Sequence, residues 1–404
     1  MKNCIVGQSG GPTAAINATL AGVIREAKNQ SAKIGTIYGS VNGIEGILNE
    51  NFLNLSEIFK DELNLQLLIQ TPASYLGSCR KKLPDVSKDE EIYKTIFSVF
   101  EKMNVGYFFY IGGNDSMDTV DKLNDYAVLH NIDVKIMGVP KTIDNDLPVT
   151  DHTPGFGSAA KYIATTVREV AVDAFVYDLK SVLIVEIMGR NAGWLTAASA
   201  LARTDKNPAP HLIYLPENVF DLDDFIEDVK EKVSEYGNIV VCVSEGIHFK
   251  DGTYVCETTS SGLTDVFNHK CLSGTAKFLE GVVREKLGYK ARAVELNVCQ
   301  RSASHIASLV DLEESQTIGA AAVLFALKGK SGEMMYFNRE NSDSYEISIS
   351  SVDIKETANK EKCIPVEWTT KNDVLPPLFD YLKPLIQGEP KIIFEDGVPV
   401  HIMR

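Results

Sequence analysis

The chain of 404 residues is long enough for two domains of ordinary size, each with its own core. Its formal net charge of −15 excludes a general nucleic-acid or membrane-surface binder, because both need a basic face. The seven cysteines are scattered and never spaced as C-x-x-C, and no apolar run reaches the length of a membrane span. We therefore expect a cytoplasmic protein with reduced thiols.

The first predicted unit is a strand at residues 4–7, a turn containing Gly10-Gly11, and a helix with apolar residues on one face. Backbone N–H groups and the helix dipole favour an anion at such a turn. The chain has neither a P-loop nor a G-x-G-x-x-G pattern, so this turn by itself is equally consistent with an ordinary tight turn. A second strand is expected at residues 34–38, and a helix is expected from Ser56.

The loop at residues 75–82 contains glycine and ends in Arg80-Lys81-Lys82. Arginine suits bidentate contact with phosphate, so the loop is a candidate phosphate contact. A solvated loop is the alternative interpretation.

Two apolar runs, at residues 106–111 and 136–139, read as buried parallel strands that follow predicted helices. The first run leads into Gly112-Gly113-Asn114-Asp115, and the second into Pro140-Lys141-Thr142-Ile143-Asp144-Asn145-Asp146. Ligands bind beyond the carboxyl ends of such strands, so we expect glycine, lysine and carboxylate to enter one crevice. Paired carboxylates can hold a metal or take a proton, but Asx residues also cap turns. His152 lies nearby without any Ser/His/Asp or Cys/His arrangement, so we do not expect it to be catalytic.

The second half of the chain repeats the pattern. A long helix at residues 158–178 precedes a strand at residues 181–187 that ends in Met188-Gly189-Arg190. Two further strands are expected, one ending before Glu245 and one at residues 293–298, followed by Arg301. The alternation predicts an α/β protein with two Rossmann-like lobes, mostly parallel sheets and an active-site cleft between them.

The predicted lobes are discontinuous in sequence. The first comprises residues 1–157 with about 300–350, and the second comprises residues 158–299 with about 351–404. We also expect a buried helix at residues 318–327 and a strand at residues 346–350.

Three motifs occur in order at strand ends: Gly-Gly-x-x-Ser at 112–116, Pro-Lys-Thr-Ile-Asp-Asn-Asp at 140–146, and Met-Gly-Arg at 188–190. With these motifs, the chain resembles the 6-phosphofructokinase family, in its pyrophosphate-dependent branch, from residue 4 to about residue 305. The resemblance implies reversible phosphoryl transfer from pyrophosphate to the 1-hydroxyl of D-fructose 6-phosphate, giving fructose 1,6-bisphosphate and phosphate in glycolysis. It also implies Mg²⁺ and a homo-oligomer, a dimer or tetramer. The first lobe would bind the phosphoryl donor, and the second lobe fructose 6-phosphate.

The resemblance assigns a role to each matching position. Asp144 would be the general base, supported by Thr142 and Asp146, with Lys141 and Asp115 completing the catalytic set. Asn114 would help to place the metal. The pyrophosphate-binding residues would be Gly11, Arg80, Asp115 and Lys141. The fructose 6-phosphate-binding residues would be Thr142, Asp144, Met188, Gly189, Arg190, Glu245, Arg292 and Arg301, with one or two of the arginines supplied by a neighbouring subunit.

Donor choice follows from two of these positions. ATP-dependent relatives have glycine at the positions of Asp115 and Lys141; a carboxylate at 115 would crowd and repel the α-phosphate of a nucleotide. The chain departs from the family at Asn114, where aspartate is common, and at Val298, where histidine or tyrosine is common. The alternatives are an ATP-dependent 6-phosphofructokinase, a non-catalytic sugar-phosphate-binding regulatory subunit, and a wider substrate range that includes sedoheptulose 7-phosphate.

Overall fold

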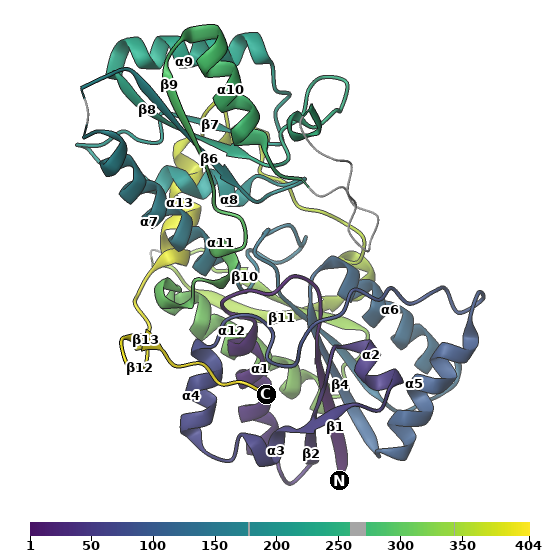
Figure 1. The fold of residues 1–404 in the computed structure, drawn as a ribbon. Helices are drawn as coiled ribbons and strands as arrows, with labels where there is room; N and C mark the ends of the chain where they lie inside the picture. Colours follow the sequence, from purple (N-terminus) through teal and green to yellow (C-terminus); the bar gives the residue numbers. More distant parts are fainter. Residues whose placement is uncertain (177, 259–271, 343) are drawn as a thin grey trace. The chain divides into compact units, whose positions relative to one another are not determined.

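The computed structural model describes residues 1–404 except 177, 259–271 and 343. The chain forms two compact units (Figure 1). The first unit comprises Met1–Ser158, Arg301–Glu361 and Gly388–Arg404; the second comprises Ala159–Gln300 and Lys362–Gln387. Within the described part of the chain, no helix is both long and apolar enough to cross a membrane.

The first unit is built on a seven-stranded sheet with the order β11-β10-β5-β4-β1-β2-β3. Neighbouring strands from β10 to β2 pair in parallel, whereas β3 and β11 are antiparallel edge strands. The strands are β1 (Lys2–Gln8), β2 (Ile34–Ser40), β3 (Phe52–Asn54), β4 (Val105–Gly112), β5 (Lys135–Pro140), β10 (Glu333–Arg339) and β11 (Ile347–Asp353).

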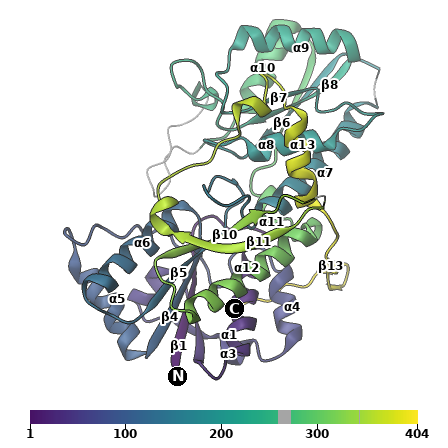
Figure 2. The same cartoon turned by 180° about the vertical axis from the view of Figure 1, so that it is seen from behind.

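Helices cover both faces of this sheet, as expected for a mainly parallel sheet whose strands are apolar on both sides (Figure 2). The helices of the unit are α1 (Ile16–Asn29), α2 (Ile44–Leu48), α3 (Leu55–Ile58), α4 (Glu62–Gln70), α5 (Glu90–Lys102), α6 (Asn114–Leu129) and α12 (Leu309–Leu327). A two-stranded hairpin, β12 (Phe394–Glu395) and β13 (Val398–Pro399), lies near the C-terminus.

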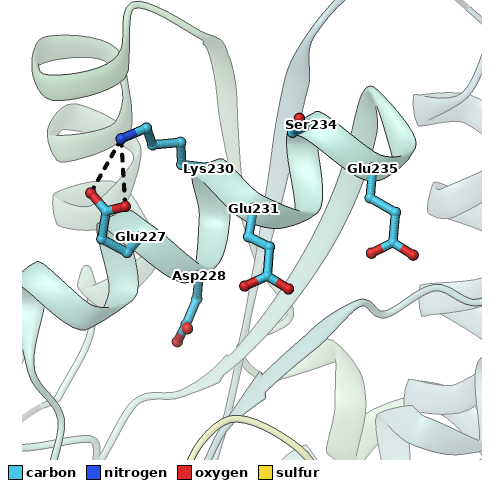
Figure 3. A pocket seen from close by; sticks show the side chains of 6 residues that line it. All are labelled: Glu227, Asp228, Lys230, Glu231, Ser234 and Glu235. Carbon is cyan, nitrogen blue, oxygen red and sulfur yellow. Dashed lines mark hydrogen bonds and ion pairs between the residues drawn. The ribbon is translucent and has the colours of Figure 1, made fainter.

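The second unit holds a parallel four-stranded sheet with the order β7-β8-β6-β9. Its strands are β6 (Ser181–Ile187), β7 (Leu212–Tyr214), β8 (Asn238–Ser244) and β9 (Lys290–Glu295). Its helices are α8 (Trp194–Ala198), α9 (Leu222–Tyr236), α10 (Thr275–Leu287) and α13 (Pro376–Leu382), together with most of α7 (Phe156–Ala174) and half of α11 (Cys299–Ser302), each of which crosses a unit boundary. One face of α9 lines a shallow pocket of acidic side chains, where Lys230 pairs with Glu227 (Figure 3). None of the predicted site residues lines it.

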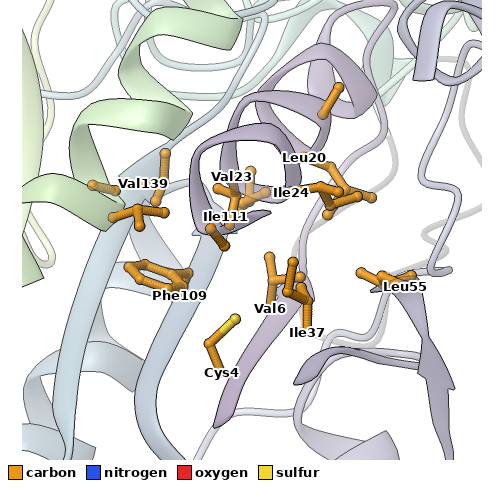
Figure 4. Close-up of a cluster of buried hydrophobic side chains, with 14 of the residues drawn as sticks. Cys4, Val6, Leu20, Val23, Ile24, Ile37, Leu55, Phe109, Ile111 and Val139 are labelled. Carbon is orange, nitrogen blue, oxygen red and sulfur yellow. The ribbon is translucent and has the colours of Figure 1, made fainter. Parts of the chain in front are cut away.

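The apolar runs of the sequence become the cores of the two units. In the first unit, β1, β4 and β5 contribute Val6, Phe109 and Val139 to a cluster beneath α1 and α12 (Figure 4). A second cluster lies between the opposite face of the sheet and α5 and α6. In the second unit, Ile184 and Val241 anchor the core under α9 and α10. Burying these side chains drives the formation of each sheet and fixes the strand register.

The expected α/β class with mostly parallel sheets is confirmed, but several boundaries are corrected. Residues 388–404 and 351–361 pack in the first unit, not the second, partly because the Gln70 amide hydrogen-bonds with the backbone of Ile393 and Val400. The strand expected at 293–298 is β9, which ends at Glu295. The helix expected at 318–327 begins nine residues earlier, at Leu309, because Ser308 caps it by accepting a hydrogen bond from the Asp311 N–H.

Helices α1 and α12 approach each other closely through two glycines. A Cβ atom at Gly22 would lie 2.0 Å from the carbonyl oxygen of Gln316, and one at Gly319 would lie 2.2 Å from that of Thr19. Only glycine permits these contacts, which bring the two backbones together and seal the core beneath.

Gly319→Ala should therefore lower the free energy of unfolding by about 2 kcal/mol, because the added methyl group forces the helices apart. The matched control is Gly281→Ala in α10, where, among the described residues outside the helix's own backbone, no atom lies within 4 Å of the added Cβ. There the same substitution should stabilise by up to about 1 kcal/mol through helix propensity. Chemical denaturation followed by far-UV circular dichroism measures both; equal effects at the two positions would contradict the packing argument.

Candidate functional site

Three parallel strand ends bring the predicted donor residues together in the first unit. In the register of the sheet, Gln8 of β1 lies beside Ile111 of β4, and Gly112 of β4 lies beside Pro140 of β5. The segments that follow these strands therefore emerge at the same edge of the sheet. They carry Gly10-Gly11, Gly113-Asn114-Asp115 and Lys141, as the sequence predicted.

Lys141 is buried at the centre of this edge. Its Nζ donates a hydrogen bond to the carbonyl oxygen of Gly11 at 2.6 Å. Burial lowers the pKa of Lys141 to about 8, opposed by Asp144 and Asp146 and reinforced by the positive charges of Arg301 and Arg80. Below about pH 8 the folded protein holds Lys141 in the charged form that burial disfavours, so the free energy of unfolding is lower there. It increases as the pH rises from about 8 towards the ordinary pKa of lysine, because the unfolded chain then binds more protons than the folded protein. A bound anion would favour the charged form instead.

The Asp144 carboxylate is held by its own loop. Thr142 Oγ1 donates to Asp144 Oδ2 at 3.1 Å and accepts from the Asp144 backbone N–H at 3.1 Å. Asn145 between the carboxylates adopts a positive φ of 55°, and its buried side chain accepts a hydrogen bond from the Thr153 N–H. These contacts fix the loop backbone while leaving the Asp144 side chain partly exposed, a placement that suits a general base.

His152 lies behind this loop and has a structural environment. Its ring is buried, with Nδ1 2.8 Å from an Asp151 oxygen and Nε2 2.7 Å from a Glu314 oxygen. Burial alone would lower the pKa of His152, but these hydrogen bonds outweigh it and raise the pKa. The ring also stacks on Phe337 with 4.6 Å between ring centroids. Both ring nitrogens are therefore engaged: Nε2 ties the loop to α12, and the face of the ring packs against β10.

The loop that carries Arg80 is tied to β1 and α1 by buried amides. Gln8 Oε1 accepts from the Leu76 N–H at 2.9 Å, and Asn17 Oδ1 accepts from the Tyr75 N–H at 2.9 Å. Gln8 Nε2 also donates to Asn17 Oδ1 at 3.0 Å, so the two amides form one network. Further along the loop, Ser78 Oγ donates to the Gly10 carbonyl at 2.6 Å. The sequence analysis missed these amides, because buried polar side chains carry no periodic signal.

The first turn of α6 follows Gly112-Gly113. A Cβ at Gly112 would lie 2.0 Å from Ser116 Oγ, so only glycine fits there. Asp115 forms an ion pair with Lys82 at 2.8 Å, which joins the loop at residues 75–82 to this helix. The side chains of Asp115 and Lys82 are 39% and 50% exposed, so this pair remains accessible to a ligand.

The expected metal ligand, Asn114, uses both ends of its amide on the protein backbone. Its Oδ1 accepts from the Asn359 N–H at 2.7 Å, and its Nδ2 donates to the Lys360 carbonyl at 2.5 Å. Among the described residues, no group of three or more His, Cys, Asp or Glu side chains could hold a metal. The donor set therefore does not form a protein cage, but it fits a cation that is held mainly by substrate phosphates, as Mg²⁺ usually is.

Five of the predicted sugar-phosphate residues lie in the second unit: Met188, Gly189, Arg190, Glu245 and Arg292. The other three, Thr142, Asp144 and Arg301, lie in the first unit. The Gly189 N–H donates to Glu245 Oε1 at 3.4 Å, and the Gly189 carbonyl accepts from Ser244 Oγ. A Cβ at Gly246 would lie 1.9 Å from the Arg190 carbonyl oxygen, so only glycine at this position lets the two strand-end loops lie this close together. Arg292 lies exposed on β9 of the same sheet. Arg301 instead belongs to the first unit, with a guanidinium nitrogen 3.5 Å from the Cβ position at Gly11.

Glu186 is a buried carboxylate in β6 that the sequence analysis did not single out. It accepts hydrogen bonds from the N–H groups of Gly274 at 3.1 Å and Ala276 at 2.8 Å, at the start of α10. Burial raises the pKa of Glu186 to about 7. In the sequence, the sign of a special role for Glu186 is that it is a charged residue inside an otherwise apolar strand.

Comparison with known proteins identifies the family. A model of the phosphofructokinase family, described as "Phosphofructokinase", matches residues 3–326. The chain belongs to the phosphofructokinase family.

Several similar members carry one name. The chain is 38% identical to pyrophosphate–fructose 6-phosphate 1-phosphotransferase of Halomonas elongata, covering 98% of this chain and 94% of that protein. It is 40% identical to the protein of that name from Xanthomonas campestris, covering 99% and 95%. The solved structure of pyrophosphate-dependent phosphofructokinase from Marinobacter aquaeolei superposes with a TM-score of 0.88 at 38% identity, covering 99% of this chain and 95% of that one.

The lowered pKa of Lys141 gives a test of whether an anion binds beside it. Because a bound phosphate favours the charged amine, pyrophosphate binding near pH 8 should be accompanied by proton uptake at Lys141. Titration calorimetry in two buffers of different ionisation enthalpy measures that uptake. Lys141→Met is the matched control, since proton exchange by pyrophosphate itself is common to both proteins. Identical proton uptake by the two would show that Lys141 does not face the anion.

Proposed function

We infer that the chain is an enzyme that transfers a phosphoryl group from pyrophosphate to the 1-hydroxyl of D-fructose 6-phosphate. The products are fructose 1,6-bisphosphate and phosphate, in a reversible reaction of glycolysis. The observation that supports this inference is the arrangement of side chains at the edge of the first sheet where β1, β4 and β5 end. There, Lys141 is buried against Gly11, and Asp115 occupies the first turn of α6. The relatives' shared name supports the same reaction.

We propose that the first unit binds pyrophosphate. Gly11, Arg80 and Lys141 supply N–H groups and positive charge to a compact anion, and the start of α6 adds its dipole. A guanidinium nitrogen of Arg301 lies near Gly11, so Arg301 is placed to contact the transferred phosphoryl group. This contact is compatible with the sugar-phosphate role that the family resemblance implies for Arg301. Charge that develops on this group during transfer is stabilised by these fixed cations.

Asp144 is the proposed general base. A carboxylate has an ordinary pKa of about 4, so it is ionised at neutral pH and can take the proton of the sugar hydroxyl. Thr142 orients this carboxylate through its hydroxyl, and Asp146 adds negative charge near Lys141. We propose that Met188, Gly189, Arg190, Glu245 and Arg292 of the second unit bind fructose 6-phosphate.

Mg²⁺ is the proposed cofactor. When bound, it would neutralise negative charge on pyrophosphate, and carboxylates near the ends of β4 and β5 would hold it with at most one or two oxygen ligands, because the Asn114 amide is hydrogen-bonded to Asn359 and Lys360. We further propose a cytoplasmic homo-oligomer, a dimer or tetramer, because the family resemblance implies that a neighbouring subunit contributes arginine to the sugar-phosphate site.

The first test is formation of fructose 1,6-bisphosphate by the purified protein with Mg²⁺ and either pyrophosphate or ATP as donor. Turnover with pyrophosphate alone is expected. Turnover with ATP alone would overturn the donor assignment, and no turnover with either would favour a non-catalytic sugar-phosphate-binding subunit. Sedoheptulose 7-phosphate in place of fructose 6-phosphate tests the acceptor range.

Asp144→Asn should lower kcat by at least about a thousandfold, because the amide cannot take the hydroxyl proton. Fructose 6-phosphate binding, measured by calorimetry, should remain within about threefold of wild type because the amide has nearly the same shape as the carboxylate. Asp133→Asn, which removes an exposed carboxylate beside Lys135, is the matched control and should keep full activity. Near-normal kcat in Asp144→Asn would reject Asp144 as the base.

Asp115→Gly together with Lys141→Gly should weaken the use of pyrophosphate and admit ATP, because the change removes both the charge and the bulk next to the donor. The ratio of kcat/KM for ATP to that for pyrophosphate measures the shift, which should exceed about a hundredfold. An unchanged ratio would contradict the steric explanation of donor choice.

A further inference from the structure

We propose that residues 354–360 form a strap that is anchored by Asn114 and limits the length of the phosphoryl donor. This proposal rests on the proposed function and assigns a specificity role to a part of the chain that lies beyond every recognised motif. Asn114 then serves as the anchor of the strap rather than as a metal ligand.

The strap lies beside α6 (Figure 1, Figure 2). Side-chain hydrogen bonds attach it to this helix at three levels. At the first residue of the helix, the Asn114 amide binds the backbone of Asn359 and Lys360. One turn further, Asp118 Oδ1 accepts from Asn359 Nδ2 at 3.2 Å. Near the end of the helix, Asp125 accepts from Lys355 Nζ at 3.0 Å.

The start of the strap is fixed by packing against the sheet. Ile354 is 1% exposed, and its Cδ1 would lie 3.2 Å from a Cβ at Gly138 of β5. Its backbone N–H donates to the Gly332 carbonyl at 3.0 Å, and the buried Thr357 hydroxyl donates back to the Ile354 carbonyl at 3.0 Å. The strap is therefore a defined turn held at both ends.

The chemistry of position 114 explains why it is asparagine. The side chain accepts one hydrogen bond from the strap and donates another to it, which only an amide can do with this geometry. An aspartate would lose the donor and place its negative charge against the Lys360 carbonyl oxygen. The departure from the family's usual aspartate thus follows from the strap contact.

The anchored strap also limits the donor site. Asn114 immediately precedes Asp115, so the backbone of Asn359-Lys360 lies against the helix start at which we place pyrophosphate. The Asp115–Lys82 ion pair joins the neighbouring loop to the same helix turn. We place a two-phosphate donor within these boundaries, so that a third phosphate would extend towards the Asn359-Lys360 backbone.

The test compares Asn114→Asp and Asn114→Ala with wild type, using pyrophosphate and inorganic tripolyphosphate as donors. Loss of one or both anchoring hydrogen bonds should raise kcat/KM for tripolyphosphate, relative to kcat/KM for pyrophosphate, by about tenfold. The Mg²⁺ concentration for half-maximal rate should not fall in Asn114→Asp. Asn338→Ala, which removes an exposed amide bonded to Glu340, is the matched control and should leave the ratio unchanged.

A second readout needs no catalysis. Trypsin cleavage after Lys355 and Lys360 should be faster in both Asn114 variants than in wild type or Asn338→Ala, because the strap opens more often. Unchanged cleavage would overturn the anchor. An unchanged donor ratio, or a lower Mg²⁺ requirement in Asn114→Asp, would overturn the specificity role and return Asn114 to the metal. Wild-type protein that does not use pyrophosphate would instead reject the proposed function, and the donor-length role with it.

Discussion

The first unit depends on the burial of one positive charge. Lys141 follows β5 directly, and its amine reaches the Gly11 carbonyl beyond β1, so it joins two strand ends across the intervening β4. Burial lowers its pKa to about 8, which means that the folded protein keeps this charge at a cost. An anion bound beside the amine would offset this cost. The hydrogen bond from Lys141 to Gly11 therefore orders these loops, and the charge of Lys141 would favour a bound phosphate.

The loops around Lys141 are ordered by buried polar side chains as well as by apolar packing. Gln8 and Asn17 fix the loop that carries Arg80, and Asn145 with His152 fixes the loop that carries Asp144. Such amides are costly to bury unless all their partners are present, so they select one loop conformation among many. Apolar contacts alone would stabilise the same loops but would allow several loop conformations. A site that must place a carboxylate and several cations benefits from this rigidity.

The C-terminal quarter of the chain completes the first unit from a distance in sequence. Residues 354–360 contact α6, and residues 391–404 lie against the loop after α4, where Ile402 and Arg404 hydrogen-bond with Thr71 and Leu76. Both segments therefore touch elements that bear proposed donor residues. Their sequence signals are weak because each contact joins a single side chain to a partner far away in the sequence, which leaves no periodic pattern.

The sequence by itself determined the α/β class, the strand ends that carry Gly11, Asp115 and Lys141, and the family. These features are local: an apolar run specifies a buried strand, and the polar residues that follow it mark the edge where ligands bind. Only the tertiary structure decided that residues 388–404 return to the first unit and that Asn114 binds the strap. Each of these depends on contacts between residues more than two hundred positions apart. Local patterns cannot encode such contacts, because the hydrogen bonds involved use backbone groups that every residue carries.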